Sequence, residues 1–149
     1  MTTIRSFMTE DHRHCDDLFA DAEKALPNVG DDTTARQAFG RFQATMLAHF
    51  DSEEKILFPT FEAKTGMSQG PTQVMRLEHA QMRALLDEAG EMLAKGKRDD
   101  CLAQFETLLI MMQQHNMKEE NILYPMCDQH LSAELPDVLA HLGKALVAA

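Results

Sequence analysis

The stretch HFDSEEKILFP at residues 49–59 returns later in the chain as HNMKEENILYP at residues 115–125. Six of the eleven positions are identical, and a seventh pairs Phe58 with Tyr124. Each copy begins with His-x-x-x-Glu, and residues four apart stand one turn apart on the same face of a helix. The repeat therefore predicts two helices that each present an imidazole beside a carboxylate.

A weaker similarity extends this repeat toward the amino terminus. The triplet DHR at residues 11–13 resembles the triplet EHA at residues 78–80, and in both cases a leucine follows the histidine by six residues. The interval from His12 to His49 is 37 residues, and the interval from His79 to His115 is 36. We therefore expect two helical hairpins related by an approximate two-fold axis.

Four long helical patterns separated by short breaker clusters predict the fold. The first spans about residues 3–26, the second runs from a cap among residues 31–34 to about residue 64, and the third runs from residues 68–71 to about residue 95. The fourth begins near residues 97–100, where Asp99 or Asp100 could cap it, and ends close to Pro125. Pro59 should kink or interrupt the second helix.

A shorter helix at about residues 135–147, with Pro136 in its first turn, should cover one end of the bundle. Because short connections favour antiparallel neighbours, we predict an all-α, up-down-up-down antiparallel four-helix bundle with this short extra C-terminal helix.

Each of the four long predicted helices has one apolar face that also carries a histidine. Residues were assigned to these faces by the i, i+3, i+4, i+7 spacing. The faces comprise Ile4, Met8, His12, Cys15, Phe19 and Ala22; Phe42, Met46, His49, Glu53 and Ile56; Met75, His79, Met82, Leu86 and Leu93; and Phe105, Leu108, Met112, His115, Glu119 and Ile122.

Two of these faces place a glutamate in the core, where a charged carboxylate is unfavourable unless it is paired or bound to a metal. Together the four faces offer four imidazoles and two carboxylates, which is a ligand set for two metal ions. This combination suits iron, with manganese and zinc as alternatives, and the carboxylates could bridge the metals. The predicted ligands are His12, His49, Glu53, His79, His115 and Glu119.

The remaining histidines and the cysteines do not fit a metal site. His14, His130 and His141 lie off the histidine-bearing faces, so we expect surface or structural roles for them. The chain has three cysteines, an odd number at wide spacing, which favours buried thiols in a reducing cytoplasm over a disulfide framework.

The bulk composition restricts the partners of the protein. A length of 149 residues fits a single domain, residues 1–149. The formal net charge of -10 disfavours nucleic acid and anionic membrane surfaces. We find no signal peptide and no apolar run long enough to span a membrane, so we expect a cytoplasmic protein.

The paired motifs, with their ILFP and ILYP tails, resemble the hemerythrin-like family, also known as the HHE cation-binding domain, over about residues 3–128. The resemblance implies a four-helix bundle with two carboxylate-bridged iron ions, with or without an oxo or hydroxo bridge, that react with dioxygen, nitric oxide or peroxide. Ferritin-like proteins use Glu-x-x-His instead.

The chain departs from the oxygen-carrying hemerythrins at two positions. Those proteins have a second histidine four residues after the histidine that matches His79, and this chain has Arg83 at that position. They also have an aspartate five residues after the histidine that matches His115, whereas this chain has Glu119 four residues after it. Its ligand set is instead similar to the di-iron domain of the bacterial repair-of-iron-centres proteins, which answer nitrosative and oxidative stress. Those proteins usually carry an extra amino-terminal, cysteine-containing domain that is not seen here.

Three functions are compatible with these features. The first is a di-iron protein that binds or reduces a small oxidant. The second is a non-catalytic iron or redox sensor, and the third is an iron storage or donation protein. The sequence does not choose between O2, NO and H2O2, nor between reversible binding and enzymatic turnover, and it indicates no protein partner.

Overall fold

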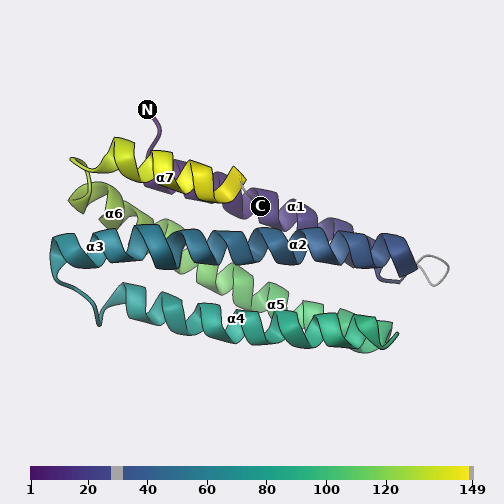
Figure 1. The fold of residues 1–149 in the computed structure, drawn as a ribbon. Coiled ribbons are helices and arrows are strands. Elements are labelled where there is room, and N and C mark those ends of the chain that lie inside the picture. Colours follow the sequence, from purple (N-terminus) through teal and green to yellow (C-terminus); the bar gives the residue numbers. More distant parts are fainter. Residues whose placement is uncertain (28–31, 148–149) are drawn as a thin grey trace.

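The computed structural model describes residues 1–27 and 32–147, which form an antiparallel bundle of four long helical rods with a short fifth helix against it (Figure 1). The all-α, up-down-up-down prediction is confirmed. Two rods are single α-helices, and each of the other two has a short π-helical segment (η) between α-helical parts. The elements are α1 (Ile4–Ala25), α2 (Asp32–Ser52), η1 (Glu53–Leu57), α3 (Phe58–Thr65), α4 (Pro71–Ala94), α5 (Arg98–Lys118), η2 (Glu119–Leu123), α6 (Tyr124–His130) and α7 (Leu135–Val147).

The rods are arranged as the two hairpins that the repeat predicted. α1 packs along α2 of the rod α2–η1–α3, and α4 packs along α5 and η2 of the rod α5–η2–α6. Residues 66–70 connect the first hairpin to the second. The two copies of the repeated motif start in the last turns of α2 and α5, respectively, and run through the π segment that follows.

Two helix ends in the first hairpin follow the sequence signals. Thr3 caps α1: its Oγ1 accepts the backbone N–H of Ser6 at 3.0 Å, and Ser6 Oγ accepts the backbone N–H of Thr3 at 2.9 Å. α3 ends at Gly66, whose φ of 72° is a left-handed conformation that glycine adopts without strain. The second rod was expected to be capped among residues 31–34; Asp32 lies in the first turn of α2, and residue 31 lies outside the described residues.

The predicted cap of the fourth rod is wrong. α5 begins at Arg98 after Lys97, which makes no side-chain capping bond. Asp99 and Asp100 instead lie in the first turn, where an acidic side chain still interacts favourably with the helix dipole.

The prolines do not end the rods in which they lie. The fourth rod was predicted to end close to Pro125, but it continues through α6 to His130, and Pro59 is likewise passed. A proline in an α-helix has no N–H to donate, and its ring clashes with the carbonyl four residues earlier. In each rod a wider π turn ends two residues before the proline and changes the spacing of these carbonyls.

The π turns also shift the buried face by one residue. The predicted core residues are buried except Ile56, which is half-buried, and Ile122, which is 55% exposed; Leu57 and Leu123 are buried in their place. The α-helical spacing used for the prediction does not hold in an i→i+5 turn, where one additional residue is needed to return to the same face.

Two apolar clusters fill the bundle, on either side of the histidines. One cluster is formed by residues 15–26, 38–50, 82–93 and 101–112 and includes the packed rings of Phe19, Phe42 and Phe105. The other is formed under α3, α6 and α7. The histidine-bearing turns therefore lie between two regions of packed apolar side chains.

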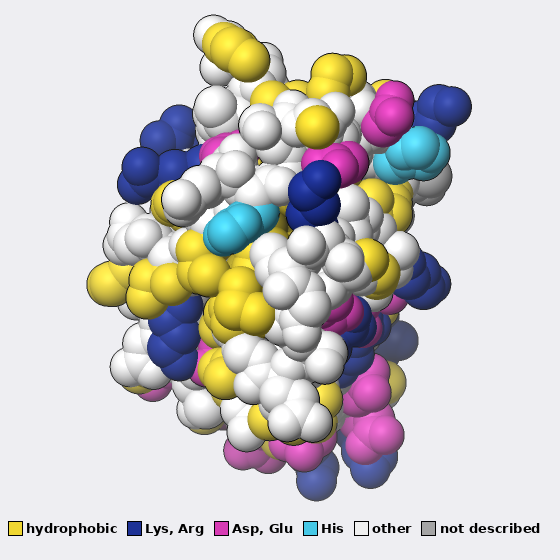
Figure 2. Space-filling model, turned by 90° about the vertical axis from the view of Figure 1, so that its left-hand side faces the viewer, with side chains coloured by type: hydrophobic (Ala, Val, Ile, Leu, Met, Phe, Trp, Pro, Cys, Tyr) yellow, Lys and Arg dark blue, Asp and Glu magenta, His cyan; other side chains and the backbone are white. Residues whose placement is uncertain are grey.

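α7 covers a flank of the bundle more than its end. It packs on α1, α2 and η1, and Val138 and Leu142 are buried there (Figure 1). Figure 2 views the end of the bundle that is on the left of Figure 1; hydrophobic side chains gather over part of it and charged ones lie around its rim. Among the described helices, none combines the length and the apolar character needed to cross a bilayer.

Candidate metal centre

All six predicted ligands meet in one buried cluster in the middle of the bundle. His12 comes from α1, His49 from α2, His79 from α4 and His115 from α5, and none of the six side chains belongs to a residue more than 3% exposed. Glu53 and Glu119 are the first residues of η1 and η2.

The ligand atoms fall into two overlapping groups. His12, His49 and Glu119 form one group, and Glu53, His79, His115 and Glu119 form the other; within each group the candidate atoms lie within 4.8 Å of one another. Glu119 belongs to both groups. Glu53 also approaches the first group, since its Oε1 is 3.3 Å from His49 Nε2.

Each histidine is oriented by a second acidic side chain on its outer nitrogen. We call Asp11, Glu54, Glu78 and Glu120 the outer carboxylates. Their oxygens lie 2.6–2.8 Å from the Nδ1 atoms of His49, His79, His115 and His12, respectively. A carboxylate at Nδ1 holds the proton on that nitrogen, so Nε2 faces the centre with a free lone pair, the form that binds a metal.

The inward-facing atoms are short of hydrogen-bond partners. Glu53 Oε1, His79 Nε2, His115 Nε2 and Glu119 Oε2 are buried and make no hydrogen bond within the described part of the chain. Buried polar atoms in folded proteins are nearly always satisfied. All four are donor atoms of the kind that iron accepts, so the centre fits a metal on chemical grounds.

The electrostatics of the cluster favour positive charge. Burial lowers the pKa of His49, but the charge of Glu53 and a hydrogen bond with Asp11 outweigh burial and raise this pKa well above its ordinary value. Burial raises the pKa of Glu119, but the charge of His115 and further hydrogen bonds hold it well below the usual range. The Glu119 carboxylate thus stays ionised and attracts either protons or metal ions to the centre.

Tyr124 is part of the centre, although only its similarity to Phe58 drew attention to it in the sequence. Its Oη lies 2.9 Å from Glu53 Oε2 and 3.0 Å from Glu119 Oε1. Five residues correspond to a rotation of about 140° in an α-helix, which would turn Tyr124 away from Glu119. The backbone N–H of Tyr124 bonds to the carbonyl of Glu119 across the π turn, and this brings both side chains to the centre.

Arg83 pairs with acidic side chains outside the six candidate ligands. It does not pair with Glu53 or Glu119, and it does not extend freely into solvent. Its Nη2 lies 3.0 Å from Asp51 Oδ1 and 3.1 Å from Glu54 Oε2, and its guanidinium lies over the ring of Phe50. Arg83 therefore contacts an outer carboxylate, and it is linked to His79 only through that carboxylate.

Signals for the outer carboxylates were present in the repeat. Glu54 and Glu120 are identical between the two copies, and Asp11 and Glu78 are the acids that precede the paired histidines. Their role was missed because each of them contacts a histidine on another rod.

The other histidines and the cysteines lie where the sequence predicted. His14, His130 and His141 are exposed. The three cysteines are buried and free, and burial raises the pKa of Cys15 to about 12, which makes its thiol unreactive.

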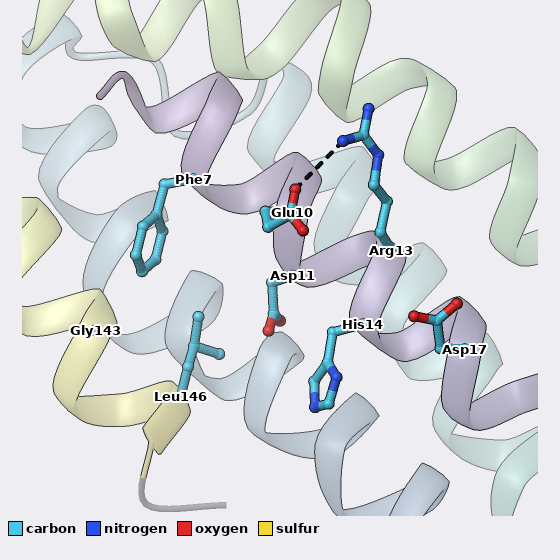
Figure 3. Close-up of a pocket in the computed structure, with 8 residues that line it drawn as sticks. All are labelled: Phe7, Glu10, Asp11, Arg13, His14, Asp17, Gly143 and Leu146. Carbon is cyan, nitrogen blue, oxygen red and sulfur yellow. Dashed lines mark hydrogen bonds and ion pairs between the residues drawn. The ribbon is translucent and has the colours of Figure 1, made fainter. Parts of the chain in front are cut away.

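A surface groove of about 550 Å³ between α1 and α7 reaches the edge of the centre (Figure 3). Asp11, whose carboxylate holds His49, lines it together with Glu10 and His14. Solvent can therefore approach an outer carboxylate, while the six inner side chains stay buried.

The comparisons with known proteins agree with this geometry. The chain matches the family described as hemerythrin HHE cation binding domain over residues 3–127. Comparisons with curated proteins and with solved structures returned no match. The family and the buried histidine–glutamate cluster together fit a metal-binding protein. The match covers most of the chain and includes every candidate ligand, so the chain belongs to the hemerythrin HHE cation-binding family.

Proposed function

We propose that the protein holds two iron ions and binds or reduces a small oxidant, O2, NO or H2O2, in an oxidative or nitrosative stress response. The observation that carries this proposal is the buried cluster of four imidazoles and two carboxylates in which each histidine is fixed by an outer carboxylate. Bound iron would supply the electron-transfer chemistry.

In this proposal one iron ion is bound by His12 and His49, the other by His79 and His115, and Glu53 and Glu119 bridge them. The grouping of the ligand atoms supports the division, with Glu119 common to both groups. Each metal would then be held by side chains of both hairpins.

The surroundings of the cluster favour small and uncharged ligands. Five buried methionines, Met8, Met46, Met75, Met82 and Met112, lie on the same helix faces as the ligands. Flexible thioether side chains adapt to irregular space without introducing charge. A diatomic gas or peroxide suits such a site better than a larger polar substrate.

The proposal is tested by metal analysis and optical titration. After anaerobic loading with Fe(II), metal analysis should give two irons per chain, and one or fewer would contradict the six-ligand centre. The reduced protein should then be titrated separately with O2, NO and H2O2. We expect repeated consumption of at least one of them when an electron donor is supplied.

A sensor is the second candidate, favoured by the contribution of both hairpins to the ligand groups. Binding or loss of metal would then change how firmly the hairpins are joined. A single stoichiometric spectral change in the same titration, without turnover, would favour this function.

We also propose that residues 1–149 act as a single cytoplasmic domain. The packing of α7 on the first hairpin and the three free cysteines support this proposal.

A further inference from the structure

The hydroxyl of Tyr124 lies among the inward-facing ligand atoms, on the side of His12 and His49. Besides its contacts with the two glutamates, Oη lies 3.2 Å from His12 Nε2 and 3.5 Å from His49 Nε2. The residue is completely buried. Its position is therefore set by the packing of the core.

These distances match those between neighbouring ligands of one metal ion. In an octahedral site with bonds of about 2.1 Å, adjacent ligand atoms are separated by about 3 Å. The four distances from Oη to Glu53, Glu119, His12 and His49 range from 2.9 to 3.5 Å. A phenol has only one proton to donate, so the Tyr124 hydroxyl can satisfy only one of its two carboxylate neighbours, Glu53 and Glu119, at a time. A metal ion among these atoms would remove this conflict.

The equivalent position in the other half of the repeat has no oxygen. There the residue is Phe58, whose ring stacks on His79 with centroids 5.7 Å apart. The approximate two-fold symmetry of the centre is thus broken at the pair Tyr124 and Phe58.

The outer carboxylates break the symmetry in the same direction. Glu54 pairs with Arg83, and Glu78 pairs with Lys118. Among the residues that the structure describes, Asp11 and Glu120 have no lysine or arginine partner. The acids behind His79 and His115 each have a cationic side chain beside them that offsets their negative charge, whereas the acids behind His12 and His49 have no such lysine or arginine within the described part of the chain.

We propose that Tyr124 is a seventh protein ligand, bound through Oη to the metal on His12 and His49, and that it makes this position the one that prefers ferric iron. The inference rests on the proposed two-metal centre. Coordination to Fe(III) replaces the phenolic O–H bond by an O–Fe bond; the proton leaves to solvent, and no electron is transferred. A phenolate is a hard, anionic ligand, which suits a trivalent ion.

The composition of the chain makes the test specific, because Tyr124 is the one tyrosine and there is no tryptophan. The ferric protein should show a visible phenolate-to-iron charge-transfer band, with phenolate modes in its resonance Raman spectrum. Tyr124→Phe, which reproduces the side chain at Phe58, should lose both signals completely. Redox-inert Ga(III) added to the unaltered protein should produce a tyrosinate difference spectrum in the ultraviolet.

Phe58→Tyr combined with Tyr124→Phe is the matched control, since it moves the hydroxyl to the side of His79 and His115. The charge-transfer band should return, shifted in energy by the different ligand set. Metal analysis accompanies every spectrum. A wild-type protein that binds no iron would contradict the proposed function itself. A wild-type protein with two irons that shows neither phenolate signal nor Ga(III) response would overturn only the role of Tyr124.

Discussion

Each histidine of the centre lies between two carboxylates, one at each ring nitrogen. His79, for example, has Glu54 at Nδ1 and Glu53 at Nε2, while His115 has Glu78 and Glu119. The outer contact fixes the tautomer and the ring orientation, and the inner contact is the one that a metal would replace. We therefore expect the metal affinity of the centre to depend on residues that do not face it.

Asp11 provides a direct test of this dependence, because its contact is with His49. Asp11→Ala should weaken metal binding about 10- to 100-fold, as loss of a supporting carboxylate does in other metal sites. Competition with a chelator of known affinity would measure the change. Asp17→Ala removes an exposed acid from the same helix and is the control. Equal affinities for the two variants would contradict an orienting role for Asp11.

The two inner glutamates should not be equivalent. Glu119 belongs to both groups of ligand atoms, and Glu53 belongs to one. We expect Glu53→Gln to weaken the position on His79 and His115 more than the position on His12 and His49, and Glu119→Gln to weaken both positions by at least about tenfold. Calorimetric titration of the two variants with the same metal would separate these outcomes, and indistinguishable isotherms would argue against a shared Glu119.

The π segments are the elements that bring the centre together. Each starts at an inner glutamate and is followed by Phe58 in one half and by Tyr124 in the other. Each also ends two residues before a proline. A local widening of the helix thus allows the rod to pass the proline and turns an additional side chain toward the centre.

A neighbouring pair of residues tests the shift in η2. Leu123 is buried, whereas Ile122, which the α-helical spacing had placed in the core, is 55% exposed. Leu123→Ala should lower the free energy of unfolding by about 2–5 kcal/mol, as is typical of a buried leucine. Ile122→Ala should change it by no more than about 0.5 kcal/mol. Urea unfolding of both metal-free variants would measure this, and a larger loss for Ile122→Ala would mean that η2 is α-helical in solution.

Periodicity and repetition predicted the fold and the inner side chains because both depend on regular helical spacing. The faces carrying His12 and His79 contain no irregular turn, and all of their predicted members are buried. The prediction for Ile56 and Ile122 was wrong because one extra residue per π turn leaves no clear trace in the pattern of apolar residues. The outer carboxylates and Tyr124 depend on contacts between rods, which helical spacing within one rod does not describe.

The molecule as a whole is a pair of similar hairpins with unequal surroundings. α7 packs on the first hairpin, and the exposed large hydrophobic residues include Val74, Leu77, Ile110 and Met117 on the second. The candidate metal ligands of both hairpins meet at the interface. We therefore expect packing and metal binding to contribute together to the stability of the bundle.

The stabilising effect of the metals should increase with pH. In the metal-free centre, burial lowers the pKa of His79 and His115, but hydrogen bonds and charges of nearby carboxylates outweigh it, so both lie above the ordinary value of 6.5. Such histidines bind their protons more tightly when folded. They stabilise the metal-free fold below about pH 6.5, and this stabilisation is lost as the pH rises through the raised pKa.

Metal binding requires Nε2 without a proton, so protons compete with the metal at low pH. We expect the difference in melting temperature between metal-loaded and metal-free protein to widen from about pH 6 to about pH 8. Glu53→Ala should narrow the difference throughout, because it removes a ligand and a buried charge. Scanning calorimetry would measure both effects. Identical melting with and without iron would contradict a buried metal centre.

The route of the chain gives α7 a further consequence. Residues 66–70 are the covalent connection between the hairpins, yet α7, which follows the second hairpin in sequence, packs on α1, α2 and η1 of the first. A protease that cleaved the chain within residues 66–70 would therefore produce two fragments that remain associated. The contacts of α7 with the first hairpin and the shared ligands in the centre would hold them together. In size-exclusion chromatography, we expect the cleaved protein to elute as a single complex. The complex should separate into its two fragments more readily once a chelator has removed the metal.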